Sequence, residues 1–352
     1  MKKFLFLVLA LLLMGSFTGL FAEHARVMPT DVGRVYFAPS YIWGNKSFDD
    51  DAEKHKTGTP LKFFNMGLAL EHGVNSWLTA ALQWTPGYNL YSKIDRPTVG
   101  DADAKDMGDL FVGAKTQLIG PKALLVQSDQ MRFAIAPGLK VPLTSGPDFE
   151  KEFNKIGAND DYTAAKLDKH VIGAGWRLYY DYLFTKEFYI NFYNQTIFYP
   201  MKGKFKHSDL GAIGALRGVN APAAYNGAVR AGDVDYKYDI VFEVEPNYTF
   251  EIAPKTTFEF GLPINYTANP AAEYEFSSSA AGGVEAAKTN VKDNASNGKK
   301  TQIITVKPTI GVFFTDWAVP IEIKLGYFVP VWGKNTKANN TINSQIRVYY
   351  KI

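Results

Sequence analysis

Charged side chains recur at alternate positions along the chain, and of all its residues they are best suited to act on a solute. The acidic ones gather on two neighbouring stretches and are Asp239, Glu243, Glu245, Glu251 and Glu259. The basic ones, with one acid among them, fall on other stretches and are Lys115, Arg132, Lys140, Arg177 and Asp181, then Lys307, Lys324 and Arg347. Acidic and basic walls facing a wet lumen would create a transverse field in a pore. Alternatively, the same charges pair with one another and only stiffen the structure.

Catalytic patterns are weak. The five histidines fall in a tail, in loops or at strand ends, and none accompanies a serine and an acid in a recognisable order. No Cys/His spacing suggests zinc, and no glycine-rich motif after a strand suggests a nucleotide site. Cysteine is absent, which excludes disulfides and a thiol nucleophile. We therefore predict no enzyme, no metal and no cofactor.

The charged residues must be positioned by β-strands, and residues 187–200 show the strand pattern most clearly. Phe188, Ile190 and Phe192 alternate there with Tyr189 and Asn191. A β-strand sends alternate side chains to opposite faces, so one face is apolar and the other polar. The pattern returns at lengths of about ten residues, which is typical of membrane-spanning strands.

About twelve such strands are predicted, an even number as in single-chain bacterial outer-membrane barrels. They are residues 33–44, 61–72, 76–85, 108–119, 131–143, 169–182, 187–200, 237–252, 256–267, 301–314, 321–331 and 341–352. Short turns alternate with long loops, and short turns belong on the periplasmic side. The predicted fold is an all-β, antiparallel, up-and-down transmembrane barrel with both termini in the periplasm. The low-complexity stretch 269–300 is expected to be mobile and unpacked.

Residues 1–22 form the predicted signal peptide. Lys2 and Lys3 precede an apolar run, and the run is too short for a helical membrane span of about 20 residues. Residues 23–32 are then a short periplasmic tail, and residues 33–352 form the barrel. Losing Lys2 and Lys3 leaves 36 of the 38 basic residues against 35 acidic ones, a balance that does not indicate nucleic-acid binding.

The apolar face of the strands predicts contact with outer-membrane lipid, because a closed barrel leaves no unpaired edge. Aromatic residues near strand ends would form the interfacial girdles; they are Trp43, Trp84, Trp176, Tyr238 and Tyr266. The competing interpretation is an ordinary aromatic core in a soluble β-protein. So many ionisable groups on the other face would be costly in such a core and are acceptable in a wet lumen.

The strand plan and the terminal R-V-Y-Y-K-I resemble Gram-negative outer-membrane channels. The plan is similar to the broad group of fatty-acid transporters and barrels associated with aromatic-compound degradation. The resemblance implies passive uptake of small solutes in the bacterial outer membrane and insertion by the barrel assembly machinery. The chain departs from the group in two ways: it ends in Ile352 rather than Phe, and its tail is too short for a plug domain.

We therefore predict a porin-like channel for small solutes, lined by the charged residues named above. The alternative is a non-conducting barrel whose long loops bind ligands or host surfaces. The sequence names no substrate and no oligomeric state.

Overall fold

A computed structural model describes residues 24–94, 102–103, 107–144, 162–163, 169–204, 231–277 and 298–351. The predicted signal peptide lies outside these residues. In the described ranges, no helix is long and apolar enough to cross a membrane.

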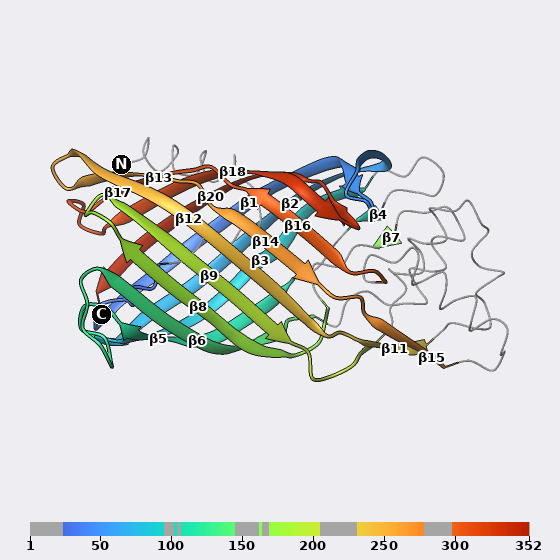
Figure 1. The fold of residues 1–352 in the computed structure, drawn as a ribbon, viewed down its shortest axis with the longest axis horizontal. Coiled ribbons are helices and arrows are strands. Elements are labelled where there is room, and N and C mark those ends of the chain that lie inside the picture. Colours follow the sequence, from blue (N-terminus) through green and yellow to red (C-terminus); the bar gives the residue numbers. More distant parts are fainter. Residues whose placement is uncertain are drawn as a thin grey trace.

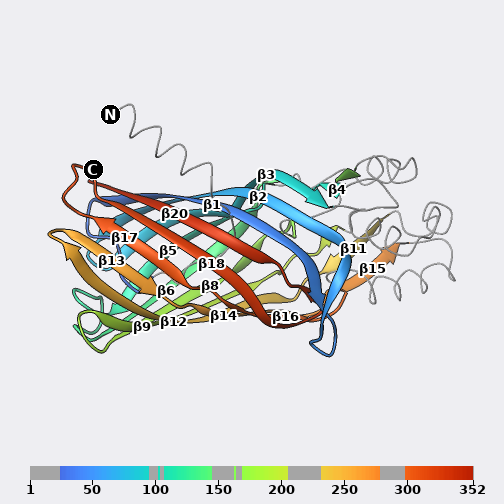
Figure 2. The same cartoon turned by 90° about the horizontal axis from the view of Figure 1, so that it is seen from above.

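A closed antiparallel barrel of twelve strands makes up most of the described chain (Figures 1 and 2). Two of the twelve are each divided by a short break. In chain order the strands are β1 Val32–Phe48, β2 Lys54–Asn75, β3 Leu78–Ile94, β5 Asp109–Ile119, β6 Met131–Pro142, β8 Gly173–Leu183, β9 Phe188–Phe198, β12 Tyr238–Ala253, β13 Thr256–Gly261 with β14 Ile264–Asn269, β16 Thr301–Val306 with β17 Thr309–Phe314, β18 Ile321–Lys334 and β20 Asn340–Lys351.

The barrel closes where the last strand pairs with the first. Val35 of β1 lies opposite Val348 of β20, while the other side of β1 pairs with β2. All neighbouring strands of the barrel wall pair antiparallel, as expected for an up-and-down order. This confirms the predicted twelve-stranded antiparallel barrel.

Proline explains the two divided strands. Pro263 separates β13 from β14, and Pro308 separates β16 from β17. Proline has no backbone N–H, so it interrupts the hydrogen-bond ladder. The ladder is repaired locally, because the Lys307 N–H donates to the Pro263 carbonyl at 2.8 Å and the Tyr327 N–H to the Pro308 carbonyl at 3.1 Å.

Two stretches predicted as loops, residues 45–60 and 86–107, contain strand residues, and there the prediction was wrong. β1 continues to Phe48, β2 begins at Lys54 and β3 continues to Ile94. Beyond the barrel, β10 Gly203–Lys204, β11 Ala231–Asp235 and β15 Glu273–Ser277 form a separate three-stranded sheet. Figures 1 and 2 place β11 and β15 at the end of the molecule opposite the C-terminus. Part of stretch 269–300 is therefore paired; residues 278–297 lie outside the described chain.

Apolar side chains cover the outside of the barrel. Across four neighbouring strands, Leu70, Leu82, Val112 and Leu139 lie in one register row. Each of the four is 39–49% exposed. At the end nearer the long loops, the aromatic rings of Trp176, Phe198 and Tyr238 form consecutive contacts across β8, β9 and β12. Such a surface is costly in water and suits lipid.

Candidate solute pathway inside the barrel

The interior face of the barrel carries most of the predicted site residues. Nine of them are at most 7% exposed: Lys115, Arg132, Arg177, Asp181, Glu243, Glu245, Lys307, Lys324 and Arg347. Lys140, Asp239 and Glu259 are half-buried. Glu251 lies apart from the others: it is exposed and accepts a hydrogen bond from the Lys255 N–H at the β12–β13 turn.

The acidic and basic groups are joined by ion pairs. Glu243 accepts from Lys307 at 2.8 Å and from the Asn265 amide at 3.0 Å. Glu259 pairs with Lys324 on the neighbouring wall. Further interior pairs among the described residues are Lys140–Asp109 at 2.5 Å, Lys169–Asp239 at 2.5 Å, Arg347–Glu322 at 3.2 Å, Lys324–Glu322 at 3.3 Å, Arg132–Asp181 at 3.7 Å and Arg34–Glu71 at 2.5 Å.

These pairs bring in five interior partners that the sequence prediction left out of the site: Arg34, Glu71, Asp109, Lys169 and Glu322. The same alternation could have found four of them, because each of these precedes or follows an apolar residue in a strand; Lys169 lies between Asp168 and His170 and gave no such signal. Arg177 behaves differently from the paired residues. Its guanidinium stacks at 3.7 Å from the Phe111 ring centre, and it donates to the side-chain oxygens of Gln83 and Gln195.

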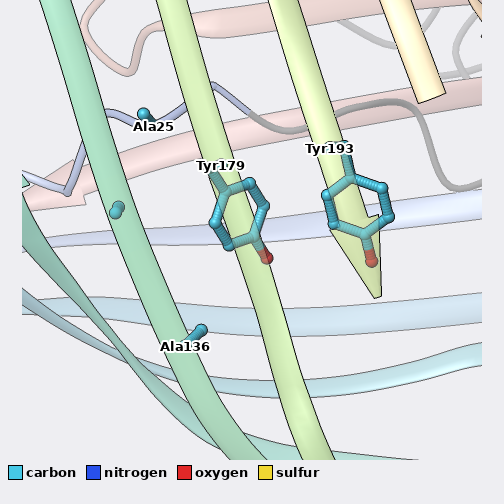
Figure 3. Close-up of a cluster of buried hydrophobic side chains, with 5 residues drawn as sticks. Ala25, Ala136, Tyr179 and Tyr193 are labelled. Carbon is cyan, nitrogen blue, oxygen red and sulfur yellow. The ribbon is translucent and has the colours of Figure 1, made fainter. Parts of the chain in front are cut away.

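The N-terminal tail lies inside the barrel in the structure, whereas the sequence led us to expect a short tail in the periplasm. Ala25 is fully buried, and its N–H donates to both carboxylate oxygens of Asp181 at 3.0 Å. Figure 3 shows Ala25 in one apolar cluster with Ala136, Tyr179 and Tyr193 of the wall. The Lys115 ammonium donates to the His24 carbonyl at 3.2 Å. Wall side chains thus form hydrogen bonds with backbone groups of the tail. The residue pattern of the tail alone could not reveal these contacts.

Gly73 lets the tail pass close to the wall. A Cβ atom at this position would lie 2.0 Å from the carbonyl oxygen of Pro29, so a larger residue would push the tail away. Two contacts hold the tail beside this point: the Asp31 N–H donates to the Gly73 carbonyl at 3.0 Å, and the Met28 N–H donates to Thr79 Oγ1 at 2.8 Å. The tail is therefore fixed to the inner wall near the β2–β3 turn.

A cavity of about 560 Å³ remains between the tail and the wall. Its lining includes residues next to the β8–β9 and β17–β18 turns, such as Lys186 and Pro320, so it lies at the short-turn end of the barrel. Arg26, Met28 and other tail residues form one side. Residues of the wall form the other side, among them Glu259 and Arg347.

A group of side chains with metal-ligating atoms lies at the turn between β1 and β2. Asp49, Glu53 and His55 bring one ligand atom each within 4.8 Å of one another. Hydrogen bonds from the Glu53 backbone N–H and then from His55 lower the pKa of Asp49. His55 itself holds the Asp49 carboxylate at 2.8 Å, and the whole group is exposed or half-buried, so the geometry is accounted for by these internal contacts.

Comparison with known proteins found no matching family model and no matching curated protein. Among solved structures, an outer membrane channel from Pseudomonas putida F1 superposes with a TM-score of 0.61 at 11% identity, over 94% of this chain and 100% of that chain. The toluene transporter TodX from P. putida gives a TM-score of 0.39 at 9% identity, over 96% and 95% of the two chains. The first likeness extends over the entire barrel. The chain has the fold of an outer-membrane β-barrel channel.

Proposed function

We propose that the chain is a channel of the bacterial outer membrane that lets small solutes pass passively through its interior. One observation carries the proposal: the wall strands turn apolar side chains outward, and their inner faces carry most of the buried polar and ionic side chains beside a few apolar ones such as Phe111 and Ala136. Charged groups inside a barrel surrounded by lipid are costly unless they are paired with one another or meet water and polar solutes there. The thirteen predicted site residues are proposed to line this interior, except for Glu251 at the turn.

The orientation follows from the connections. Tight turns such as residues 76–77 and 254–255 lie at the end where β20 ends, and the sheet of β11 and β15 lies beyond the other end. We infer that the tight turns and both termini face the periplasm, as is usual for such barrels. The chain has no cysteine, so Val74→Cys and Lys202→Cys would each carry a unique label. An impermeant reagent on intact cells is expected to label the Lys202→Cys variant only; the reverse result would invert the orientation.

The channel is tested in planar lipid bilayers. Purified full-length mature protein is expected to give discrete conductance steps, and the same preparation heated until the barrel unfolds serves as the control. An absence of steps from folded protein at any voltage would refute the channel. Outer-membrane lipid and the barrel assembly machinery are the partners that this proposal implies, and depletion of that machinery is expected to remove the folded, heat-resistant form from cells.

A second function is favoured by a different observation. The tail and the ion pairs occupy much of the interior, and the sheet of β10, β11 and β15 projects beyond the barrel. A non-conducting barrel that presents its long loops to ligands or host surfaces would show the same features. Folded protein without conductance, together with binding that is lost when the β10–β11–β15 sheet is removed, would support this alternative.

A further inference from the structure

We propose that the cavity between the tail and the wall binds small organic anions, with a carboxylate held by the basic side chains and an apolar body against the aromatic wall. The inference rests on the proposed channel function and names the class of solute that the channel would favour. Four features of the cavity carry it: the sign of its charge, an unsatisfied buried donor, its apolar wall and its size.

Basic side chains outnumber acidic ones around the cavity. Six line it, Arg26, Arg34, Lys115, Lys186, Arg132 and Arg347, against Glu259 and Glu322. Two further interior carboxylates, Glu71 and Asp181, lie next to Arg34 and Arg132 and do not reverse the excess. Arg26 and Lys186 are exposed and form no ion pair with a carboxylate in the part of the chain that the structure describes. The local potential is therefore positive and attracts anions.

The two acidic residues of the lining are already engaged. Glu322 accepts from Arg347 at 3.2 Å and from the Tyr349 hydroxyl at 2.7 Å. Glu259 pairs with Lys324 and accepts from the Tyr189 hydroxyl at 3.0 Å. Carboxylates held in this way have little capacity left for a cationic solute. The cavity thus selects against cations as well as for anions.

Arg132 supplies a donor that nothing in the described protein satisfies. The residue is 7% exposed and lines the cavity, and one Nη atom lies 3.7 Å from Asp181. Its Nε–H has no hydrogen-bond partner. A buried unpaired donor costs free energy, and a bound carboxylate would remove this cost while forming the charge-assisted bond that guanidinium groups favour.

Apolar groups occupy the remainder of the lining. Val27 and Met28 contribute from the tail, and the rings of Phe313 and Tyr349 lie 5.3 Å apart on the wall. The volume falls within the usual range of small-molecule pockets, about 300–1,000 Å³. A fully hydrated inorganic anion would leave this wall uncovered, whereas a ring or short alkyl chain would bury it. These features together favour organic carboxylates over chloride.

Benzoate is the probe, with benzyl alcohol and benzylammonium as neutral and cationic controls of similar shape. Titration calorimetry on the full mature protein in neutral detergent is expected to show saturable benzoate binding and much weaker binding of both controls. Arg26→Gln and Lys186→Gln are each expected to weaken benzoate binding by about two- to fivefold, as for one exposed ion pair. Lys255→Gln removes an exposed base at the same end, outside the lining, and is expected to bind as the unaltered protein does.

Both substituted bases are exposed, so the variants keep the buried network, and the heat-resistant band in gel electrophoresis verifies that each one is folded. Equal binding of all three probes, an absence of benzoate binding, or equal affinity in the Lys186→Gln and Lys255→Gln variants would overturn the anion site. Conductance is recorded on the same samples. Conductance steps without benzoate binding would support the channel and refute the anion site. Benzoate binding without conductance steps would support the anion site and refute the channel.

Discussion

Two parts of the interior carry similar side chains in different arrangements. Most interior acids of β12, β13 and β18 face a base, as in Glu243 with Lys307 and Glu259 with Lys324, while Glu245 accepts from the Asn191 amide instead. At the short-turn end, Arg26 and Lys186 reach the cavity without a carboxylate of their own among the described residues. The difference shows that pairing, rather than the number of charges on a strand, decides whether a charge is available to a solute. The acidic stretch is thus a structural wall, and the cavity is the part able to select solutes.

Breaking one buried pair tests this contrast most strongly. Lys307→Met leaves Glu243 uncompensated, and we expect a loss of about 3–5 kcal/mol in the free energy of unfolding. The double variant Glu243→Gln/Lys307→Met removes both charges and is expected to recover much of this loss. Urea unfolding in detergent micelles, followed by the heat-resistant gel band, measures both. A single variant as stable as the double one would mean that the pair is solvated.

The same wall tests the origin of selectivity. Replacing Glu243 and Glu245 with Gln nearly keeps their shape and removes two buried carboxyl groups. Because Glu243 is already paired and Glu245 accepts from Asn191 at 3.4 Å, we expect stability to fall and the reversal potential in a salt gradient to stay nearly constant. A clear loss of cation preference, largest at low salt, would show instead that these carboxylates act on permeating ions.

Displacing the tail should have an intermediate effect. Gly73→Ala places a methyl group against the Pro29 carbonyl, an overpacking that typically costs about 1–3 kcal/mol. If the tail narrows the interior, conductance is expected to rise several-fold as the tail moves away. Val74→Ala at the neighbouring exposed position is the control and should change neither quantity. Unaltered conductance in a folded Gly73→Ala protein would argue that the tail does not obstruct passage.

The smallest effect is expected at the opposite end, on the exposed sheet beyond the barrel. Lys202 pairs with Glu275 at 2.6 Å, and this hydrogen bond raises the pKa of Lys202. A raised lysine pKa contributes stability that is complete at lower pH and is lost only as pH rises past the lysine range. We therefore expect Lys202→Gln and the unaltered protein to unfold alike, with the same pH dependence, from about pH 6 to pH 9. A pH-dependent difference in that interval would show that the pair is less screened than its exposure implies.

The sequence predicted the wall well because the wall is periodic. All twelve strands appear where alternation placed them, since one face meets lipid and the other meets polar groups. The alternation of apolar and polar residues failed to predict strands where both faces of the strand meet the same surroundings. Residues 54–60 extend a strand beyond the row of lipid-facing leucines, so their composition resembles that of a loop. The division of two strands at Pro263 and Pro308 could have been anticipated from the missing N–H groups.

The tail could not be predicted because its contacts are distant in sequence. Ala25 and Asp181 are 156 residues apart, and no local pattern links them. Gly73 stands out in the sequence, but there it indicates part of a tight turn. The turn in the structure is at residues 76–77, and Gly73 instead provides room for the Pro29 carbonyl. The cavity could not be predicted for the same reason, because its lining combines the tail with residues of ten wall strands.

The seam between β1 and β20 has a consequence for the order of assembly. It joins the two ends of the barrel sequence, so its ladder is among the contacts of longest sequence separation and forms slowly. The tail directly precedes β1 and is held inside by Asp181 of β8, which is 156 residues away from Ala25 in the sequence. The tail must therefore enter the interior before the seam closes, or else pass through an opening after closure. A folding intermediate with an open seam would be the stage at which the final interior is decided.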